Sequence, residues 1–253
     1  MRIDLNSDVG ESFGAYTIGH DAGLMKSITS ANIAAGFHGG DPTVLRDTIR
    51  LARKNGVAVG AHPGFPDLVG FGRRELNVTP REAEDCVLYQ LAAVAGVASA
   101  EGVRLQHVKP HGALFNMAVK DPELASAIAR AVAAFDASLI LFGLPGSQIL
   151  HAGRAAGLRV AAEVFADRAY EPNGQLVSRR KPGAVIHDAG LVVARAVRMV
   201  KDGRVVSSDG TVVPLESDTI CLHGDTPGSD DLAAKVRAGL EAAGITVKAI
   251  GQP

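Results

Sequence analysis

Short apolar runs alternate along this chain with amphipathic stretches, which is the pattern of strands that alternate with helices. Strands are predicted at 2–7, 29–37, 57–62, 105–110, 139–144, 159–165, 219–223 and 245–250. Most of these runs are followed by a helical pattern. Strands connected in this way pair in parallel, and their carboxyl ends emerge on one side of the sheet.

Helix start and stop signals agree with this order. Asp41 is expected to cap a helix that begins at Pro42 and ends near Gly56. Thr79-Pro80-Arg81-Glu82 matches a capping box, in which the threonine and glutamate side chains each bond a free backbone N–H of the first turn. Further helices are predicted at about 79–102, from 121 onwards, and at 147–157.

The regular order breaks at about 170–217, where a loop rich in Pro, Gly and Arg precedes a helix near 188–201. A hairpin follows at about 204–213, and Asp209-Gly210 favours a two-residue turn. We interpret 1–253 as one domain, an irregular α/β barrel of seven or eight mostly parallel strands with a helix-hairpin excursion. Single-domain barrels of about 250 residues are common. A doubly wound open sheet is the alternative.

The composition limits the classes of molecule that this chain is expected to bind. The chain is 47% hydrophobic and carries 26 basic and 27 acidic residues, without a run of like charge, so we expect neither a nucleic-acid nor a membrane surface. Cys86 and Cys221 are far apart in sequence and are predicted to be buried, reduced thiols. No signal-peptide pattern and no apolar run of about 20 residues is found, so we expect a soluble cytoplasmic protein that acts on small polar molecules.

Side chains capable of chemistry follow the predicted strands. The catalytic candidates are Asp8, His38, His62, Lys109, His111 and His223. In an α/β barrel such residues meet on one face, although they are remote in sequence. Histidine exchanges protons near neutral pH, and lysine can neutralise charge that develops on an oxygen. The pattern therefore predicts an enzyme.

A second group of side chains is predicted to bind substrate: Glu11, Arg73, Glu163, Asp167 and Asp225. The guanidinium of Arg73 can clamp a carboxylate with two parallel hydrogen bonds. Simpler interpretations exist for two of the acids, because Glu11 can cap a turn and Asp225 can cap the helix that follows it.

Several of these segments together resemble the LamB/YcsF family. They are Leu5–Glu11, Asn32–Pro42, Gly60–Gly64, Val108–Asn116 and Glu163–Tyr170. The resemblance extends nearly from end to end and includes Phe71-Gly72-Arg73-Arg74 and Cys221-Leu222-His223-Gly224-Asp225. Small departures from the family pattern, Ala35 in place of a common cysteine and Gly39 in place of alanine, lie beside the candidate groups.

The resemblance implies an irregular barrel related to the glycoside hydrolase and deacetylase superfamily. It also implies a role in bacterial 5-oxoprolinase, together with two further subunits (B and C). That complex opens the lactam of 5-oxoproline to L-glutamate while it hydrolyses ATP, which is shared with or held by the partner subunits. An unstrained lactam is a poor electrophile, so phosphorylation of its carbonyl oxygen would create a competent centre for water.

For this reaction we expect Asp8 or a nearby histidine to activate water. Lys109 and the imidazoles of His38, His62 and His223 would then stabilise oxyanion charge. Two other functions stay open. One is a metal-dependent deacetylase with Asp8, His38 and His62 as ligands; the other is an inert sensor or carrier that binds a small acid. The presence of a metal and the formation of a homo-oligomer also stay open.

Overall fold

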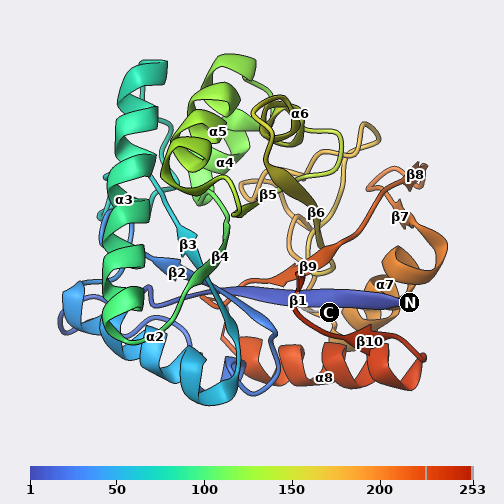
Figure 1. Cartoon of the computed structure of the whole chain (residues 1–253). Helices are drawn as coiled ribbons and strands as arrows, with labels where there is room; N and C mark the ends of the chain where they lie inside the picture. Colours follow the sequence, from blue (N-terminus) through green and yellow to red (C-terminus); the bar gives the residue numbers. More distant parts are fainter. Residues whose placement is uncertain (226, 252–253) are drawn as a thin grey trace.

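Seven parallel strands close into a barrel in the computed structural model, which describes residues 1–225 and 227–251 (Figure 1). They are β1 (Arg2–Val9), β2 (Ser30–Ala34), β3 (Ala58–His62), β4 (Leu105–Val108), β5 (Ile140–Gly143), β6 (Arg159–Phe165) and β9 (Thr219–Leu222). The barrel closes where β9 pairs with both β6 and β1. Within the described residues, the two-residue β10 (Thr246–Val247) pairs only with the start of β1. The predicted barrel is confirmed, and the open sheet is wrong.

Helices surround the barrel (Figure 1). They are α1 (Asp21–Leu24), α2 (Pro42–Asn55), α3 (Pro80–Ala100), α4 (Gly112–Ala118), α5 (Pro122–Asp136), α6 (Gln148–Ala155), α7 (Ala189–Asp202) and α8 (Ser229–Ala242). The predicted caps are confirmed: Asp41 accepts from two backbone N–H groups of α2, and Thr79 with Glu82 forms both bonds of the capping box. Among the described residues, no helix is both long and apolar enough to cross a membrane.

The barrel interior is polar, because alternate residues of β1 place Asp4, Asn6 and Asp8 on its inner side. Asn6 donates to Thr219 across the strand pair, and Asn32 donates to both Asn6 and Asp8. The branched apolar residues that usually fill such barrels are therefore replaced here by hydrogen-bonded polar side chains.

Gly60 makes room for one member of this network. His107 on β4 reaches over β3 to place its Nε2 atom 2.7 Å from Asn32 Oδ1 on β2. A Cβ atom at Gly60 would lie 2.2 Å from His107 Nε2, so a side chain at that position would displace the ring. The other face of the His107 ring is covered by Phe142, whose ring centroid is 4.3 Å away.

The excursion contains α7 and the hairpin of β7 (Arg204–Val206) and β8 (Val212–Pro214). The hairpin prediction is confirmed but its two-residue turn is wrong. Ser207 N donates to Thr211 O at 2.9 Å, which leaves three residues in the turn, with Gly210 at a φ of 91°. A glycine with positive φ at the end of the loop is typical of three-residue hairpins.

Candidate functional site

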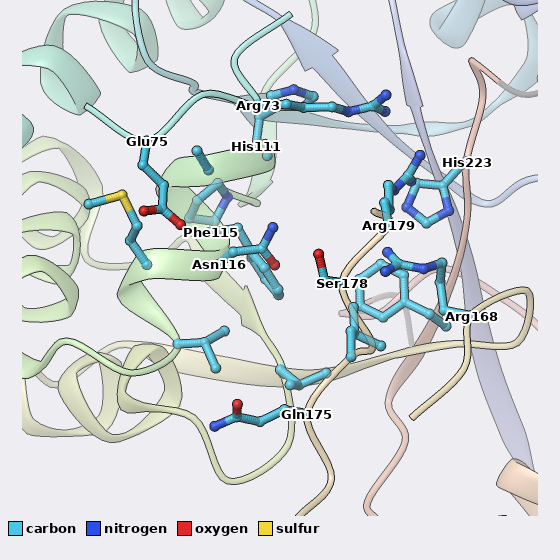
Figure 2. A pocket seen from close by; sticks show the side chains of 18 of the residues that line it. Arg73, Glu75, His111, Phe115, Asn116, Arg168, Gln175, Ser178, Arg179 and His223 are labelled. Atoms are coloured by element: carbon cyan, nitrogen blue, oxygen red, sulfur yellow. The ribbon is translucent and has the colours of Figure 1, made fainter. Parts of the chain in front are cut away.

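A cavity of about 750 Å³ opens where the barrel strands end (Figure 2). Six of the eleven predicted site residues line it: Asp8, His62, Arg73, Lys109, His111 and His223. Each of the other five contacts one of these six. Parallel pairing therefore brings the predicted side chains together, although they span more than two hundred positions of the sequence.

Lys109 forms the charged base of the cavity. Its Nζ atom lies 2.7 Å from Asp8 Oδ1, 3.1 Å from Glu163 Oε1 and 2.9 Å from Cys221 Sγ. Burial acts to lower the pKa of Lys109, but the neighbouring carboxylates of Asp8 and Glu163 raise it well above its usual value. The ammonium group therefore stays charged, and it is positioned to attract negative charge.

Asp8 is a weaker base than its position at the end of β1 suggested. Burial acts to raise its pKa, but the charges of His62 and Lys109 hold that pKa well below the usual range. Asp8 Oδ1 also accepts a hydrogen bond from Asn32. The structure thus favours Asp8 as the anion that holds Lys109, and another group as the proton acceptor for water.

His223 has the geometry of that acceptor. Its Nδ1 atom is 2.8 Å from Asp167 Oδ2, so Nδ1–H donates to the carboxylate and the lone pair of a neutral ring is on Nε2. Burial acts to raise the pKa of Asp167, but His223, Arg168 and Arg179 together outweigh it and the pKa is lowered. The Phe165 ring packs on the imidazole at 5.6 Å between centroids. A histidine oriented by a buried carboxylate at the edge of a cavity is a typical general base.

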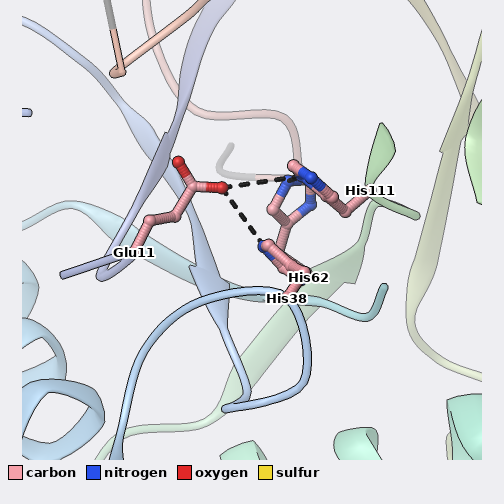
Figure 3. A group of neighbouring side chains, drawn as sticks. All are labelled: Glu11, His38, His62 and His111. Atoms are coloured by element: carbon pink, nitrogen blue, oxygen red, sulfur yellow. Dashed lines mark hydrogen bonds and ion pairs between the residues drawn. The ribbon is translucent and has the colours of Figure 1, made fainter. Parts of the chain in front are cut away.

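Glu11, His38, His62 and His111 form a second cluster, which we call the histidine cluster (Figure 3). One ligand atom from each of the four lies within 4.8 Å of all the others, so the cluster can hold a metal ion. Glu11 Oε1 is 3.2 Å from His38 Nε2 and 3.5 Å from His111 Nδ1. Asp8, the expected oxygen ligand of the deacetylase alternative, is not a member of this group.

Arg73 and Asp225 pair at the rim of the cavity, with 2.6 Å between Arg73 Nη2 and Asp225 Oδ2. The guanidinium also lies over the Phe71 ring, 4.9 Å from its centroid. The alternative of Asp225 as a helix cap is wrong, because α8 begins after Gly228 and its N-cap makes no side-chain hydrogen bond. Asp225 instead neutralises and orients the arginine.

One wall of the cavity comes from the excursion, a role that was not predicted from the sequence. Arg168, Ser178 and Arg179 lie across the cavity from Phe115 and Asn116 (Figure 2). Arg168 holds the wall in place by donating to the backbone carbonyls of the excursion. The feature of the sequence that could have indicated this wall is the basic run Arg179-Arg180-Lys181 in a loop rich in Pro and Gly.

The cavity is strongly cationic as a result. Its basic lining residues are Arg73, Arg74, Lys109, Lys120, Arg168, Arg179 and Arg180, whereas its acidic ones are Asp8 and Glu75. Clefts lined by one sign of charge concentrate ligands of the opposite sign. The site is therefore suited to a small anionic ligand.

Cys221 was predicted to be only a structural thiol, and its position inside the barrel was missed. It is buried as expected, but its Sγ atom contacts Lys109. Burial raises the pKa of this thiol well above its usual value, so it contacts the ammonium as a neutral group. Cys86, by contrast, is partly buried on α3 and contacts the Gly64 carbonyl and Gln90.

The fold and the site define an α/β barrel whose chemistry is gathered at the carboxyl ends of its strands. The chain belongs to the LamB/YcsF family, whose model matches residues 3–253. It is 55% identical over 252 residues to a protein of Thermococcus onnurineus that is named as the A subunit of 5-oxoprolinase, covering 100% of this chain and 99% of that one.

Two solved structures support the fold. The Lactam Utilization Protein from Thermus thermophilus matches with a TM-score of 0.94 and 50% identity, covering 99% of this chain and 100% of that one. The polysaccharide deacetylase Bc1974 from Bacillus cereus matches with a TM-score of 0.51 at 12% identity, covering 100% and 93% of the two chains. The second likeness is one of fold alone, and it agrees with the barrel that the resemblance to the family implies.

Proposed function

We propose that this chain is the A subunit of an ATP-dependent 5-oxoprolinase. With two partner subunits, B and C, it would open the lactam of 5-oxoproline to L-glutamate while ATP is converted to ADP and phosphate. The names of relatives that match it from end to end support the assignment. The observation that carries it is the buried Lys109 ammonium, held by Asp8 at the base of a cationic cavity.

The charges of the cavity suit this substrate. The carboxylate of 5-oxoproline is the natural partner of a guanidinium from Arg73 or Arg179, since planar carboxylates accept two hydrogen bonds from arginine. The lactam carbonyl would then face Lys109, where a full positive charge stabilises an oxyanion. ATP would be shared with or held by the partner subunits, and the same arginines would receive the phosphoryl group attached to the carbonyl oxygen.

His223 is assigned the proton transfers. Water adds to the carbon of the phosphorylated carbonyl while His223 takes a proton from that water. The carbon–nitrogen bond then breaks as His223 passes the proton to the lactam nitrogen. A second water releases phosphate from the resulting acyl phosphate. Asp167 stabilises the transient imidazolium through its bond to His223 Nδ1.

Co-expression of this chain with the two partner subunits tests the proposal. We expect glutamate to be released from 5-oxoproline only when ATP is present, with ADP formed in proportion. Binding of 5-oxoproline without turnover in the full assembly would contradict the proposal and favour a carrier. Release of acetate from acetylated sugars by the isolated chain would favour the deacetylase alternative.

A further inference from the structure

Two ring nitrogens of the histidine cluster face each other at hydrogen-bonding distance. His62 Nδ1 is 2.7 Å from the Lys109 carbonyl oxygen, and His111 Nε2 is 2.8 Å from that of Phe71. A carbonyl only accepts, so each of these nitrogens carries its ring's hydrogen. The opposite nitrogens, His62 Nε2 and His111 Nδ1, are 2.9 Å apart and in neutral rings present lone pairs to each other. A cation between or beside them, either a metal ion or a further proton on one ring, relieves the repulsion between these lone pairs.

The remaining two members turn toward the same point. Glu11 Oε1 lies within 3.5 Å of both His38 Nε2 and His111 Nδ1 (Figure 3). The four residues are at most 4% exposed. Four buried side chains thus present their ligand atoms to one point, which is the arrangement that a bound cation requires.

The backbone around the cluster is arranged to hold it. Phe71 has a φ of 54°, which a residue with a side chain rarely adopts, and this conformation directs its carbonyl to His111 Nε2. At the next residue, Gly72, a Cβ atom would lie 2.7 Å from His38 Cβ and 2.8 Å from His111 Cδ2. The loop thus allows these two rings to stack with centroids 3.7 Å apart.

We propose that Glu11, His38, His62 and His111 bind one divalent transition-metal ion, with zinc as the ion that best suits three imidazoles and one carboxylate. Imidazole ligands favour zinc and its neighbours over magnesium and calcium. Carbonyl groups that fix the outer nitrogens of His62 and His111 are the usual second partners of metal-binding histidines. Since His62 and His111 also line the cavity, the ion would lie at its wall.

A metal at this place would polarise a substrate oxygen or lower the pKa of a bound water. Metal binding by the histidine cluster does not depend on the proposed function. If the chain failed to open 5-oxoproline, the cluster would still bind metal; if the cluster bound none, Lys109 and His223 would still be in place. The two proposals therefore fail separately.

Metal content and metal-induced stabilisation of the full-length chain test the inference. Protein treated with a chelator, reloaded with zinc and freed of excess metal should contain one zinc per chain by elemental analysis. Zinc should also raise the Tm of the chelated wild type, because a ligand that binds only the folded state stabilises it. Cobalt in place of zinc should give a visible absorption band of a low-coordinate nitrogen site.

Glu11→Gln and His62→Gln remove one ligand each and should lower zinc affinity at least about 10-fold. Even the loss of a side chain that only hydrogen-bonds to a metal ligand lowers affinity by about that factor. His151→Gln, an exposed histidine on α6, is the matched control and should bind zinc as the wild type does. Should a ligand variant fail to fold, the wild-type titration decides alone. Substoichiometric zinc, no shift in wild-type Tm, or wild-type affinity in the folded ligand variants would overturn the inference.

Discussion

Lys109 and Asp8 are 101 residues apart in the sequence, yet Lys109 Nζ and Asp8 Oδ1 lie 2.7 Å apart inside the barrel. The strands that precede and carry them, β4 and β1, are separated by β2 and β3, so the contact crosses the interior. Glu163 approaches the same ammonium from β6. Three parts of the sheet are thus joined by one buried cation, which makes the charge of Lys109 important for both stability and chemistry.

Replacement of Lys109 by methionine should therefore destabilise the fold. Lys109→Met leaves Asp8 and Glu163 buried without their cation, and removal of one partner of a buried pair costs about 3–5 kcal/mol. Urea unfolding of the purified chain measures this loss. Adding Glu163→Gln should recover part of it, because the second change removes a carboxyl that has lost its partner. A loss below about 1 kcal/mol, or none recovered in the double variant, would contradict the arrangement.

Substitution of Gly60 should also destabilise the fold, because His107 of the polar interior packs against it. Gly60→Ala would place a Cβ atom 2.2 Å from His107 Nε2, and we expect a loss of about 1–3 kcal/mol in the free energy of unfolding from this overpacking. Gly96→Ala is the matched control, since Gly96 is exposed within α3 and nothing lies within 4 Å of the added atom. It should stabilise the chain slightly, because alanine favours a helix over glycine. Equal effects of the two changes would argue against a tightly packed His107.

The barrel, and the position of the predicted site residues at one end of it, could be predicted from the sequence. Hydrophobic periodicity defines strands and helices, and parallel connection places residues such as Asp8 and Lys109 at the same end of the sheet. Start signals such as Thr79 and Asp41 act within one turn of helix, so they too can be recognised locally. Both kinds of information depend on spacing alone.

Other features depend on contacts between parts of the chain that are remote in sequence. The spacing of residues does not determine these contacts. Cys221 was expected to be merely buried, but the closure of β9 onto β1 places it against Lys109. Asp225 has the sequence context of a helix cap, and only the return of the 71–74 loop gives it Arg73 as a partner. The wall formed by Arg168 and Arg179 likewise depends on an irregular excursion without a periodic pattern.

That wall leads to a prediction about substrate affinity. Arg179→Gln should raise the KM for 5-oxoproline about 10- to 150-fold with little change in kcat, because loss of a charged hydrogen bond to the carboxylate costs about 1.5–3 kcal/mol. Steady-state kinetics of the assembled enzyme give both parameters. Arg154→Gln on the outer helix α6 is the control and should leave KM unchanged. An unchanged KM in Arg179→Gln would exclude this arginine from substrate binding.

Asp167 should act through His223, to which it is hydrogen-bonded. Asp167→Asn keeps the shape of the side chain but removes the charge that stabilises a protonated imidazole. We therefore expect kcat to fall and the acid limb of the kcat/KM profile to move to lower pH. An unshifted profile with reduced kcat would indicate that Asp167 supports only the local fold.

The most direct test of the account is the rate of ATP-dependent glutamate release by an assembly that carries His223→Asn. If His223 performs the proton transfers at the mouth of this barrel, the rate should fall at least about 100-fold while 5-oxoproline binding and assembly with the partners persist. His151→Gln on α6 should leave the rate at its wild-type value. Turnover by His223→Asn close to that of the wild type would contradict the account.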